Sequence, residues 1–207
     1  MKIKVCGMRE RDNLAELAEK VNPDFTGFIF HPKSPRYFLD GTEEIPDEIL
    51  PENRVGVFVN ATKAEVLGLA RMFQLNNIQL HGNETHEFCK AIIDEGFTVI
   101  KAFGIKEIED FDQLGKYVKS CHYFLFDTKT NDYGGSGKKF NWAMIDQVKI
   151  QKPFFLSGGV DSVDVKEIKN LKNQPFAIDI NSRFEINPGK KDIEKIKLFK
   201  QKLFIHA

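Results

Sequence analysis

Pro153-Phe154-Phe155-Leu156 runs directly into Ser157-Gly158-Gly159, and this change from apolar to small residues decides the fold. An apolar run without alternation is typical of a strand that is covered on both faces, as in a parallel sheet packed against helices. The two glycines end that strand and lead into a helix that we expect near residues 161–163. A strand followed at once by a helix is part of the βαβ unit from which parallel sheets are built.

The same strand-to-helix unit recurs along the whole chain. Strand ends lie 22 to 30 residues apart, and helical patterns lie between them. The eight expected strands cover residues 3–6, 25–30, 54–59, 77–80, 98–103, 123–126, 153–156 and 176–180. Eight near-equal units favour closure into a single (β/α)8 TIM barrel of the α/β class, although barrels of this kind are commonly nearer ~250 residues. An open, doubly wound sheet is the structural alternative.

Three of the intervening segments carry clear helical signatures. Apolar residues within 14–21 and within 193–203 recur at the three- and four-residue spacing of an amphipathic helix. Thr62 and Glu65 have the spacing of a capping box, so a helix is expected to begin there.

Length and charge limit the possible functions. A chain of 207 residues fits one domain, which we expect to span residues 1–207. Its 30 lysines and arginines balance its 30 aspartates and glutamates, so the chain lacks the basic excess that attracts nucleic acid or an anionic membrane. We therefore expect neither a nucleic acid nor a membrane as a partner.

The cysteines and the N-terminus indicate the compartment. Cys6, Cys89 and Cys121 are too few and too scattered for a disulfide framework or a zinc site. The first residues lack the apolar segment of a signal peptide, and no run of ~18 apolar residues occurs. These features favour a cytoplasmic protein.

Two adjoining strand ends have the residues of a phosphate site. In a TIM barrel the active site lies at the carboxyl ends of the strands, and phosphate commonly binds after the seventh and eighth strands. Gly158 and Gly159 follow the seventh expected strand, and Asn181 and Ser182 follow the eighth. Glycine lets backbone N–H groups approach an anion closely. Two ordinary turns are the alternative interpretation, but their adjoining positions favour phosphate.

The segment Asp132-Tyr133-Gly134-Gly135-Ser136-Gly137-Lys138 follows the sixth expected strand. It is not a Walker A loop, since position 132 is aspartate and position 139 is lysine, where that motif needs glycine and serine or threonine. We interpret it as a mobile active-site loop.

Several ionisable side chains lie at strand ends as acid, base or binding candidates. Asp127 follows an apolar strand, and a carboxyl group against apolar walls has a raised pKa and acts as a proton donor. Asp179 lies within a strand and needs a partner such as a ligand hydroxyl. Arg36 is either a solvated surface residue or a residue whose guanidinium group binds a substrate carboxylate through two hydrogen bonds. Cys6 is most simply a small buried apolar residue, and His81 differs from the other histidines only in its strand-end position.

These segments, taken together and in order, resemble the phosphoribosylanthranilate isomerase family of tryptophan biosynthesis. The matching motifs are Lys4-Val5-Cys6-Gly7, Gln79-Leu80-His81-Gly82, Phe126-Asp127-Thr128 and the segments 27–30, 32–37, 55–60, 134–137, 156–159 and 188–192. They are collinear and cover essentially the whole chain. The resemblance implies a (β/α)8 enzyme that converts N-(5-phosphoribosyl)anthranilate to 1-(2-carboxyphenylamino)-1-deoxyribulose 5-phosphate by an Amadori rearrangement.

The resemblance also implies a role for each candidate residue. Asp127 would be the general acid and Cys6 the general base. Arg36 would hold the anthranilate carboxylate, while His81 and Asp179 would contact the sugar. The phosphate would lie on four residues, namely Gly158, Gly159, Asn181 and Ser182. No metal and no cofactor are expected, and the partner would be this small phosphorylated substrate.

The chain departs from the family pattern at Arg183, where many members have glycine. Its role at the phosphate site stays open, as does the oligomeric state, for which we expect a monomer or alternatively a homodimer. Two other functions are alternatives: another phosphate-binding barrel enzyme, and a catalytically silent barrel that binds a phosphosugar. The presence of both Cys6 and Asp127 argues against the silent barrel.

Overall fold

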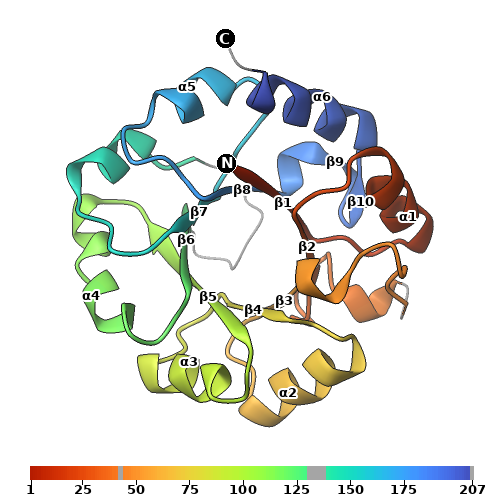
Figure 1. Ribbon diagram of the computed structural model, residues 1–207, viewed down its shortest axis with the longest axis horizontal. Coiled ribbons are helices and arrows are strands. Elements are labelled where there is room, and N and C mark those ends of the chain that lie inside the picture. The colour runs from red at the N-terminus through yellow and green to blue at the C-terminus, as the bar shows by residue number, and fades with distance from the viewer. Residues whose placement is uncertain (42–43, 130–138, 206–207) are drawn as a thin grey trace.

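Eight parallel strands form a closed barrel with helices around it in a computed structural model that describes residues 1–41, 44–129 and 139–205 (Figure 1). The strands are β1 (Lys2–Cys6), β2 (Phe25–Ile29), β3 (Arg54–Phe58), β4 (Asn77–Leu80), β5 (Thr98–Ile105), β6 (Tyr123–Thr128), β7 (Phe154–Leu156) and β8 (Ala177–Ile180). Each strand pairs with the next, and β8 pairs with β1 through Ile178 and Ile3. The TIM barrel predicted from the sequence is therefore confirmed, and the open sheet is excluded.

Every expected strand is present, and its ends lie within two residues of the expected ones. The largest differences are at β5 and β6, which continue to Ile105 and Thr128. These two strands stay paired to their ends, with Gly104 opposite Asp127. Asp127 is consequently part of a strand and not of the loop that follows it.

The helices lie outside the barrel (Figure 1). They are α1 (Arg11–Lys20), α2 (Lys63–Met72), α3 (His86–Ile93), α4 (Leu114–Tyr117), α5 (Val165–Asn170) and α6 (Ile193–Phe204). The capping box predicted at the start of α2 is confirmed: the Thr62 hydroxyl accepts from the Glu65 N–H, and the Glu65 carboxylate accepts from the Thr62 N–H at 2.8 Å. The described residues also form five short 3-10 helices, namely η1 (Phe38–Asp40), η2 (Pro51–Asn53), η3 (Ile108–Phe111), η4 (Trp142–Gln147) and η5 (Ser182–Phe184).

The prediction of a helix near residues 161–163 was wrong by a few positions. The helix α5 begins at Val165, and residues 162–164 form a turn. The Asp164 carboxylate accepts a hydrogen bond from the Asp161 N–H at 2.8 Å, which closes that turn before the helix starts. The segment after Gly159 is thus a turn fixed by an aspartate side chain.

Two apolar cores explain why the strands have no polar alternation. Side chains on one face of each strand fill the barrel interior, for example Phe155 of β7 and Leu125 of β6. Side chains on the other face pack against the helices, for example Phe154 and Leu156 of β7. Both faces of β7 are therefore buried, and the unbroken apolar run is the result.

A small hairpin that the sequence pattern did not predict follows β8. It consists of β9 (Glu185–Asn187) and β10 (Lys190–Lys191), and it lies beside β1 and α1 (Figure 1). Asn13 of α1 holds it: its side chain accepts from the Lys191 N–H at 2.7 Å and donates to the Lys191 carbonyl at 3.0 Å. The hairpin brings two ionisable side chains, Glu185 and Lys191, into the buried part of the molecule.

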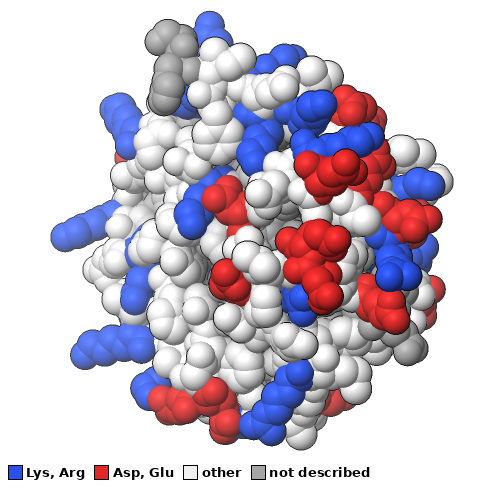
Figure 2. Space-filling view, turned by 45° about the vertical axis from the view of Figure 1, so that its right-hand side comes forward, with Lys and Arg blue, Asp and Glu red and all other residues white. Residues whose placement is uncertain are grey.

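Acidic and basic side chains both occur across the face drawn in Figure 2, in keeping with the balanced charge of the chain. Among the described residues, no helix combines the length and the apolar character needed to cross a membrane.

Candidate active site

The candidate site is the polar layer at the carboxyl ends of the barrel strands. Below it, the barrel interior is filled by apolar side chains such as Leu125 and Phe155. Alternation along each strand places Cys6 (β1), Asp127 (β6) and Asp179 (β8) on the same inward face as that filling. Side chains far apart in the sequence therefore meet at one end of the barrel, as the TIM barrel requires.

Cys6 is buried against a glycine of the neighbouring strand. It pairs with Gly27 of β2, and a Cβ atom added at position 27 would lie 2.7 Å from the Cys6 Sγ atom. Burial raises the pKa of the Cys6 thiol, Lys4 opposes that rise, and Asp179 adds to it. Lys191 also favours the thiolate. Cys6 thus has cations close by, which the simple interpretation of a buried apolar cysteine did not anticipate.

Asp127 faces a histidine. Its Oδ2 atom lies 3.2 Å from the His81 Nε2 atom, and its Oδ1 atom accepts from the Thr128 N–H at 2.8 Å. Both side chains are partly exposed, at 17% for His81 and 18% for Asp127, so a ligand can reach them. The structure brings together two residues that the sequence placed on separate strand ends.

A buried glutamine orients the His81 ring. The Gln79 Nε2 atom lies 2.7 Å from the His81 Nδ1 atom. The Gln79 Oε1 atom has no partner among the described residues.

Asp179 already has a partner within the chain. Its Oδ1 atom accepts from the Lys4 Nζ atom at 2.9 Å, and both side chains are buried. Burial raises the pKa of the Asp179 carboxyl, and Lys4 opposes this rise. The partner that the sequence required for a carboxyl group inside a strand is therefore a lysine of β1.

Arg36 is a buried residue, so the interpretation as a solvated surface arginine is wrong. Its Nε and Nη2 atoms contact the Glu185 carboxylate at 2.7–3.0 Å, and its side chain is 9% exposed. Glu185 also accepts from the Lys191 Nζ atom at 2.5 Å. One carboxylate of the β9–β10 hairpin is thus shared by two cations.

The four phosphate candidates lie on adjoining loops, because β7 pairs with β8. Gly158 and Gly159 have φ angles of +82° and +71°, a region that favours glycine, and a Cβ atom at 158 would lie 2.5 Å from the Thr128 hydroxyl. Ser182 begins η5. The Asn181 side chain is engaged within the chain, since its Oδ1 atom accepts from the Lys191 Nζ atom at 2.7 Å.

Reasoning from the sequence missed Lys4, Gln79, Glu185 and Lys191. A signal existed for the first two, because each precedes a candidate on the same strand face by two residues, Lys4 before Cys6 and Gln79 before His81. Glu185 and Lys191 reach the site through a hairpin that has no periodic signature. The predicted active-site loop at 132–138 lies outside the described residues.

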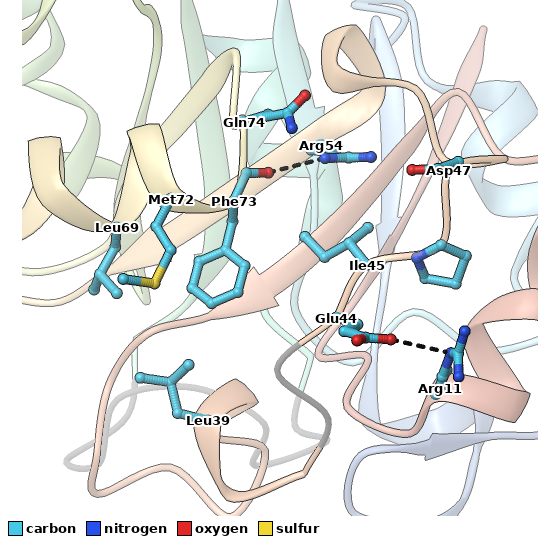
Figure 3. Close-up of a pocket in the computed structure, with 11 residues that line it drawn as sticks. Arg11, Leu39, Glu44, Ile45, Asp47, Arg54, Leu69, Met72, Phe73 and Gln74 are labelled. Atoms are coloured by element: carbon cyan, nitrogen blue, oxygen red, sulfur yellow. Dashed lines mark hydrogen bonds and ion pairs between the residues drawn. The ribbon is translucent and has the colours of Figure 1, made fainter.

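A separate cavity of about 650 Å³ lies on the side of the barrel (Figure 3). In its wall, Arg54 donates to the carbonyl oxygens of Ile49 at 2.8 Å and Phe73 at 3.0 Å. Arg54 is the first residue of β3, so this cavity adjoins the amino-terminal end of that strand. Cys6 and Asp127 lie at the opposite end, and the cavity is not part of the candidate site.

Comparison with known proteins identifies the family. The model of the N-(5'-phosphoribosyl)anthranilate (PRA) isomerase family matches residues 3–202. The chain belongs to the phosphoribosylanthranilate isomerase family. An N-(5'-phosphoribosyl)anthranilate isomerase of Parabacteroides distasonis is 44% identical, over 98% of this chain and 93% of that protein. The isomerase of Phocaeicola vulgatus is 42% identical over 96% of each chain.

Solved structures of phosphoribosylanthranilate isomerases share the fold. The enzyme from Thermotoga maritima superposes with a TM-score of 0.82 at 36% identity, over 98% of each chain. A phosphoribosylanthranilate isomerase has also been solved in complex with reduced 1-(o-carboxyphenylamino)-1-deoxyribulose 5-phosphate, and it matches with a TM-score of 0.76 at 33% identity over 98% of each chain.

Proposed function

We propose that this protein converts N-(5-phosphoribosyl)anthranilate to 1-(2-carboxyphenylamino)-1-deoxyribulose 5-phosphate in tryptophan biosynthesis. The observation that carries the proposal is membership of the isomerase family over residues 3–202. The related isomerase that was solved with a reduced form of this product supports the same small phosphorylated ligand here. The reaction is an aldose–ketose isomerisation, which needs one acid and one base.

Asp127 acts as the acid in the proposed mechanism. It protonates the ring oxygen of the furanose, the bond between that oxygen and C1 breaks, and the nitrogen lone pair forms the C1=N bond of an iminium ion. The contact with the His81 Nε2 atom at 3.2 Å supports this role, because it fixes the carboxyl group at the open end of the barrel.

Cys6 acts as the base. Its thiolate takes the proton from C2, the C2–H electron pair forms a C1=C2 bond, and the electrons of the C1=N bond return to nitrogen. The resulting enolamine gains a proton at C1 and loses one from the C2 hydroxyl to give the ketone. A thiolate is the form that acts as base. Burial is the largest effect and raises the pKa of Cys6 above its ordinary value, and Lys4 and Lys191 reduce that rise.

The remaining candidates bind the substrate. Arg36 holds the anthranilate carboxylate through Nη1, the part of the guanidinium that does not contact Glu185. His81 and Asp179 contact the sugar. The phosphate lies on the backbone N–H groups of Gly158 and Gly159 and on Asn181 and Ser182, supported by the adjoining positions of the two loops.

The test follows the fluorescence of phosphoribosylanthranilate generated in situ. The purified protein is expected to deplete it, and Cys6→Ala and Asp127→Ala are each expected to reduce kcat by about 10²–10⁴. Cys89→Ala is the matched control, because Cys89 is buried in the outer core, away from the barrel interior. Full activity of either site variant would contradict the assigned acid–base pair. Binding of the substrate without depletion would instead support the silent phosphosugar-binding barrel.

A further inference from the structure

Arg36 and Glu185 form a buried ion pair with two-point geometry. Arg36 lies in the loop after β2, and Glu185 is the first residue of β9, 149 positions further along the chain. The Arg36 Nε atom donates to both carboxylate oxygens of Glu185, at 2.8 Å and 3.0 Å, and its Nη2 atom donates to Oε2 at 2.7 Å. Parallel contacts between a planar guanidinium and a carboxylate fix the orientation of both groups.

This ion pair leaves one nitrogen of Arg36 for a ligand. Glu185 occupies the edge of the guanidinium that Nε and Nη2 form. The remaining nitrogen, Nη1, donates to no acceptor in the described part of the chain. The direction in which Nη1 points is therefore set by the contact of the opposite edge with Glu185.

The rest of Arg36 is fixed beside Cys6. Its backbone N–H donates to the Ser34 hydroxyl at 3.1 Å. Gly7, which directly follows Cys6, has a φ angle of +75°, and a Cβ atom there would lie 2.7 Å from the Arg36 Cδ atom. The aliphatic part of Arg36 thus lies against the backbone at the carboxyl end of β1, and its guanidinium belongs to the same polar layer as Cys6.

Glu185 is in turn held by its own hairpin. Its Oε1 atom accepts from the Lys191 Nζ atom at 2.5 Å and from the Gly189 N–H at 3.2 Å. Burial acts to raise the pKa of the Glu185 carboxyl, but the hydrogen bonds from Arg36 and Lys191 outweigh burial, so the group is ionised at neutral pH. Arg36 therefore contacts an acceptor that is itself fixed in place.

We propose that Glu185 is a positioning residue that makes the site selective for a carboxylate on the aromatic ring of the substrate, because it holds the Arg36 guanidinium ready for that carboxylate before the ligand binds. This inference rests on the proposed function, in which Arg36 binds the anthranilate carboxylate. A side chain that is already ordered loses little conformational entropy when a ligand binds to it. The fixed Arg36 thus binds a carboxylate more strongly than a freely rotating one would.

Glu185 has two effects on a ligand carboxylate, and they have opposite signs. Its negative charge repels the carboxylate, whereas its contact with Arg36 orients the guanidinium that binds it. Glu185→Asp separates the two effects, because aspartate keeps the charge but is one methylene shorter. It cannot reach Nε and Nη2 with the same pair of hydrogen bonds.

The test compares the binding of two ligands by isothermal titration calorimetry. The first is reduced 1-(2-carboxyphenylamino)-1-deoxyribulose 5-phosphate, and the second is the same compound with a phenyl group in place of the 2-carboxyphenyl group. Glu185→Asp is expected to raise the Kd of the first ligand by about tenfold and to change that of the second by less than about twofold. General damage to the site would weaken both ligands equally.

Two further variants serve as controls. Glu10→Asp shortens an exposed carboxylate that lies 3.5 Å from Lys190 of the same hairpin, and it is expected to leave both Kd values unchanged. Arg36→Met is expected to remove the preference for the carboxylated ligand. Adding Glu185→Asp to Arg36→Met should then have no further effect on that preference, because Glu185 acts through Arg36.

Unchanged or tighter binding of the carboxylated ligand to Glu185→Asp would overturn the proposal, and so would equal weakening of both ligands. If Glu185→Asp does not fold, as judged by circular dichroism, Glu185→Gln is tested with the same two ligands. Its single acceptor oxygen cannot serve Arg36 and Lys191 together, so the same selective loss is expected. If the unaltered protein binds neither ligand, the proposed function fails and this inference with it. Binding without selective loss overturns this inference alone.

Discussion

Gly27 determines how closely β2 approaches the thiol of Cys6. The two residues are opposite each other in the β1–β2 register, and Sγ occupies the space that a side chain at position 27 would need. Gly27 therefore shapes the site, although it has no side chain, because it leaves the space that the Cys6 thiol fills. Sequence reasoning selects residues by their chemistry, and this is why Cys6 was found and the glycine that accommodates it was not.

Gly27→Ala is expected to move or expel the Cys6 side chain. The added Cβ atom would lie 2.7 Å from Sγ and 3.1 Å from the Cys6 Cα atom, and overpacking of this kind costs about 1–3 kcal/mol of stability. Activity should fall with it, because the base is displaced. The measurement is urea unfolding together with kcat.

Gly68→Ala is the control for that substitution. Gly68 lies on the exposed side of α2, and a Cβ atom there would have nothing within 4 Å. Replacing a helical glycine by alanine is expected to stabilise the protein by about 0.5–1 kcal/mol. Equal stability changes in the two variants would show that the contact between position 27 and Cys6 has no energetic consequence.

At the scale of elements, the strands could be predicted and the hairpin could not. A strand buried on both faces has to be apolar throughout, so its position is visible in the sequence. The hairpin of β9 and β10 is instead held by polar contacts, such as those of Asn13 with the backbone of Lys191. Contacts between residues so distant in sequence leave no local pattern, and the same reason hid the pairing of Arg36 with Glu185.

The hairpin also makes stability depend on pH. Burial acts to raise the pKa of Glu185, but hydrogen bonds from Arg36 and Lys191 outweigh it, so the pKa lies below its usual value of 4.5. Because the pKa of Glu185 is lower in the folded state, its ion pairs with Arg36 and Lys191 stabilise the fold fully above pH 4.5. This contribution to stability is lost as the pH falls through the lower pKa of the folded state. Acid should therefore loosen the hairpin.

Glu185→Gln tests this expectation. Removing one partner of a buried ion pair costs about 3–5 kcal/mol, so the variant should be less stable at neutral pH. Its stability should also fall less steeply than that of the unaltered protein between pH 4.5 and lower values, as measured by denaturant unfolding at a series of pH values. Parallel curves for the two proteins would exclude Glu185 as a source of the acid sensitivity.

For the whole molecule, the fold follows from repetition. Eight apolar runs at near-equal spacing specify eight βα units, and the pairing of β8 with β1 closes them into one barrel. The sequence could not specify which loops carry α-helices: between β2 and β3 the described residues form only 3-10 helices. The near-equal spacing of the apolar runs predicts how many βα units there are, but it does not predict whether an α-helix or a 3-10 helix connects two strands.

A single domain over residues 1–207 and a monomeric state both remain predictions at this scale. One domain should unfold in a single cooperative transition, with the same midpoint by fluorescence and by circular dichroism. A monomer should show a midpoint that does not depend on protein concentration. Two separate transitions would contradict the single domain. A midpoint that rises with concentration would indicate the homodimer, a state named for the Thermotoga maritima relative that is 33% identical.

Closure of the barrel has a consequence for the time at which the protein becomes competent during its synthesis. Lys4 and Asp179 are separated by 175 positions, yet they form one ion pair beside Cys6. A ribosome releases β1 long before β8. Lys4 and Cys6 therefore have no complete site around them until nearly the whole chain has been made. Contacts this distant in sequence also form late in folding, because the connecting chain has to be ordered first. Catalytic competence is therefore among the last properties that a newly made molecule acquires.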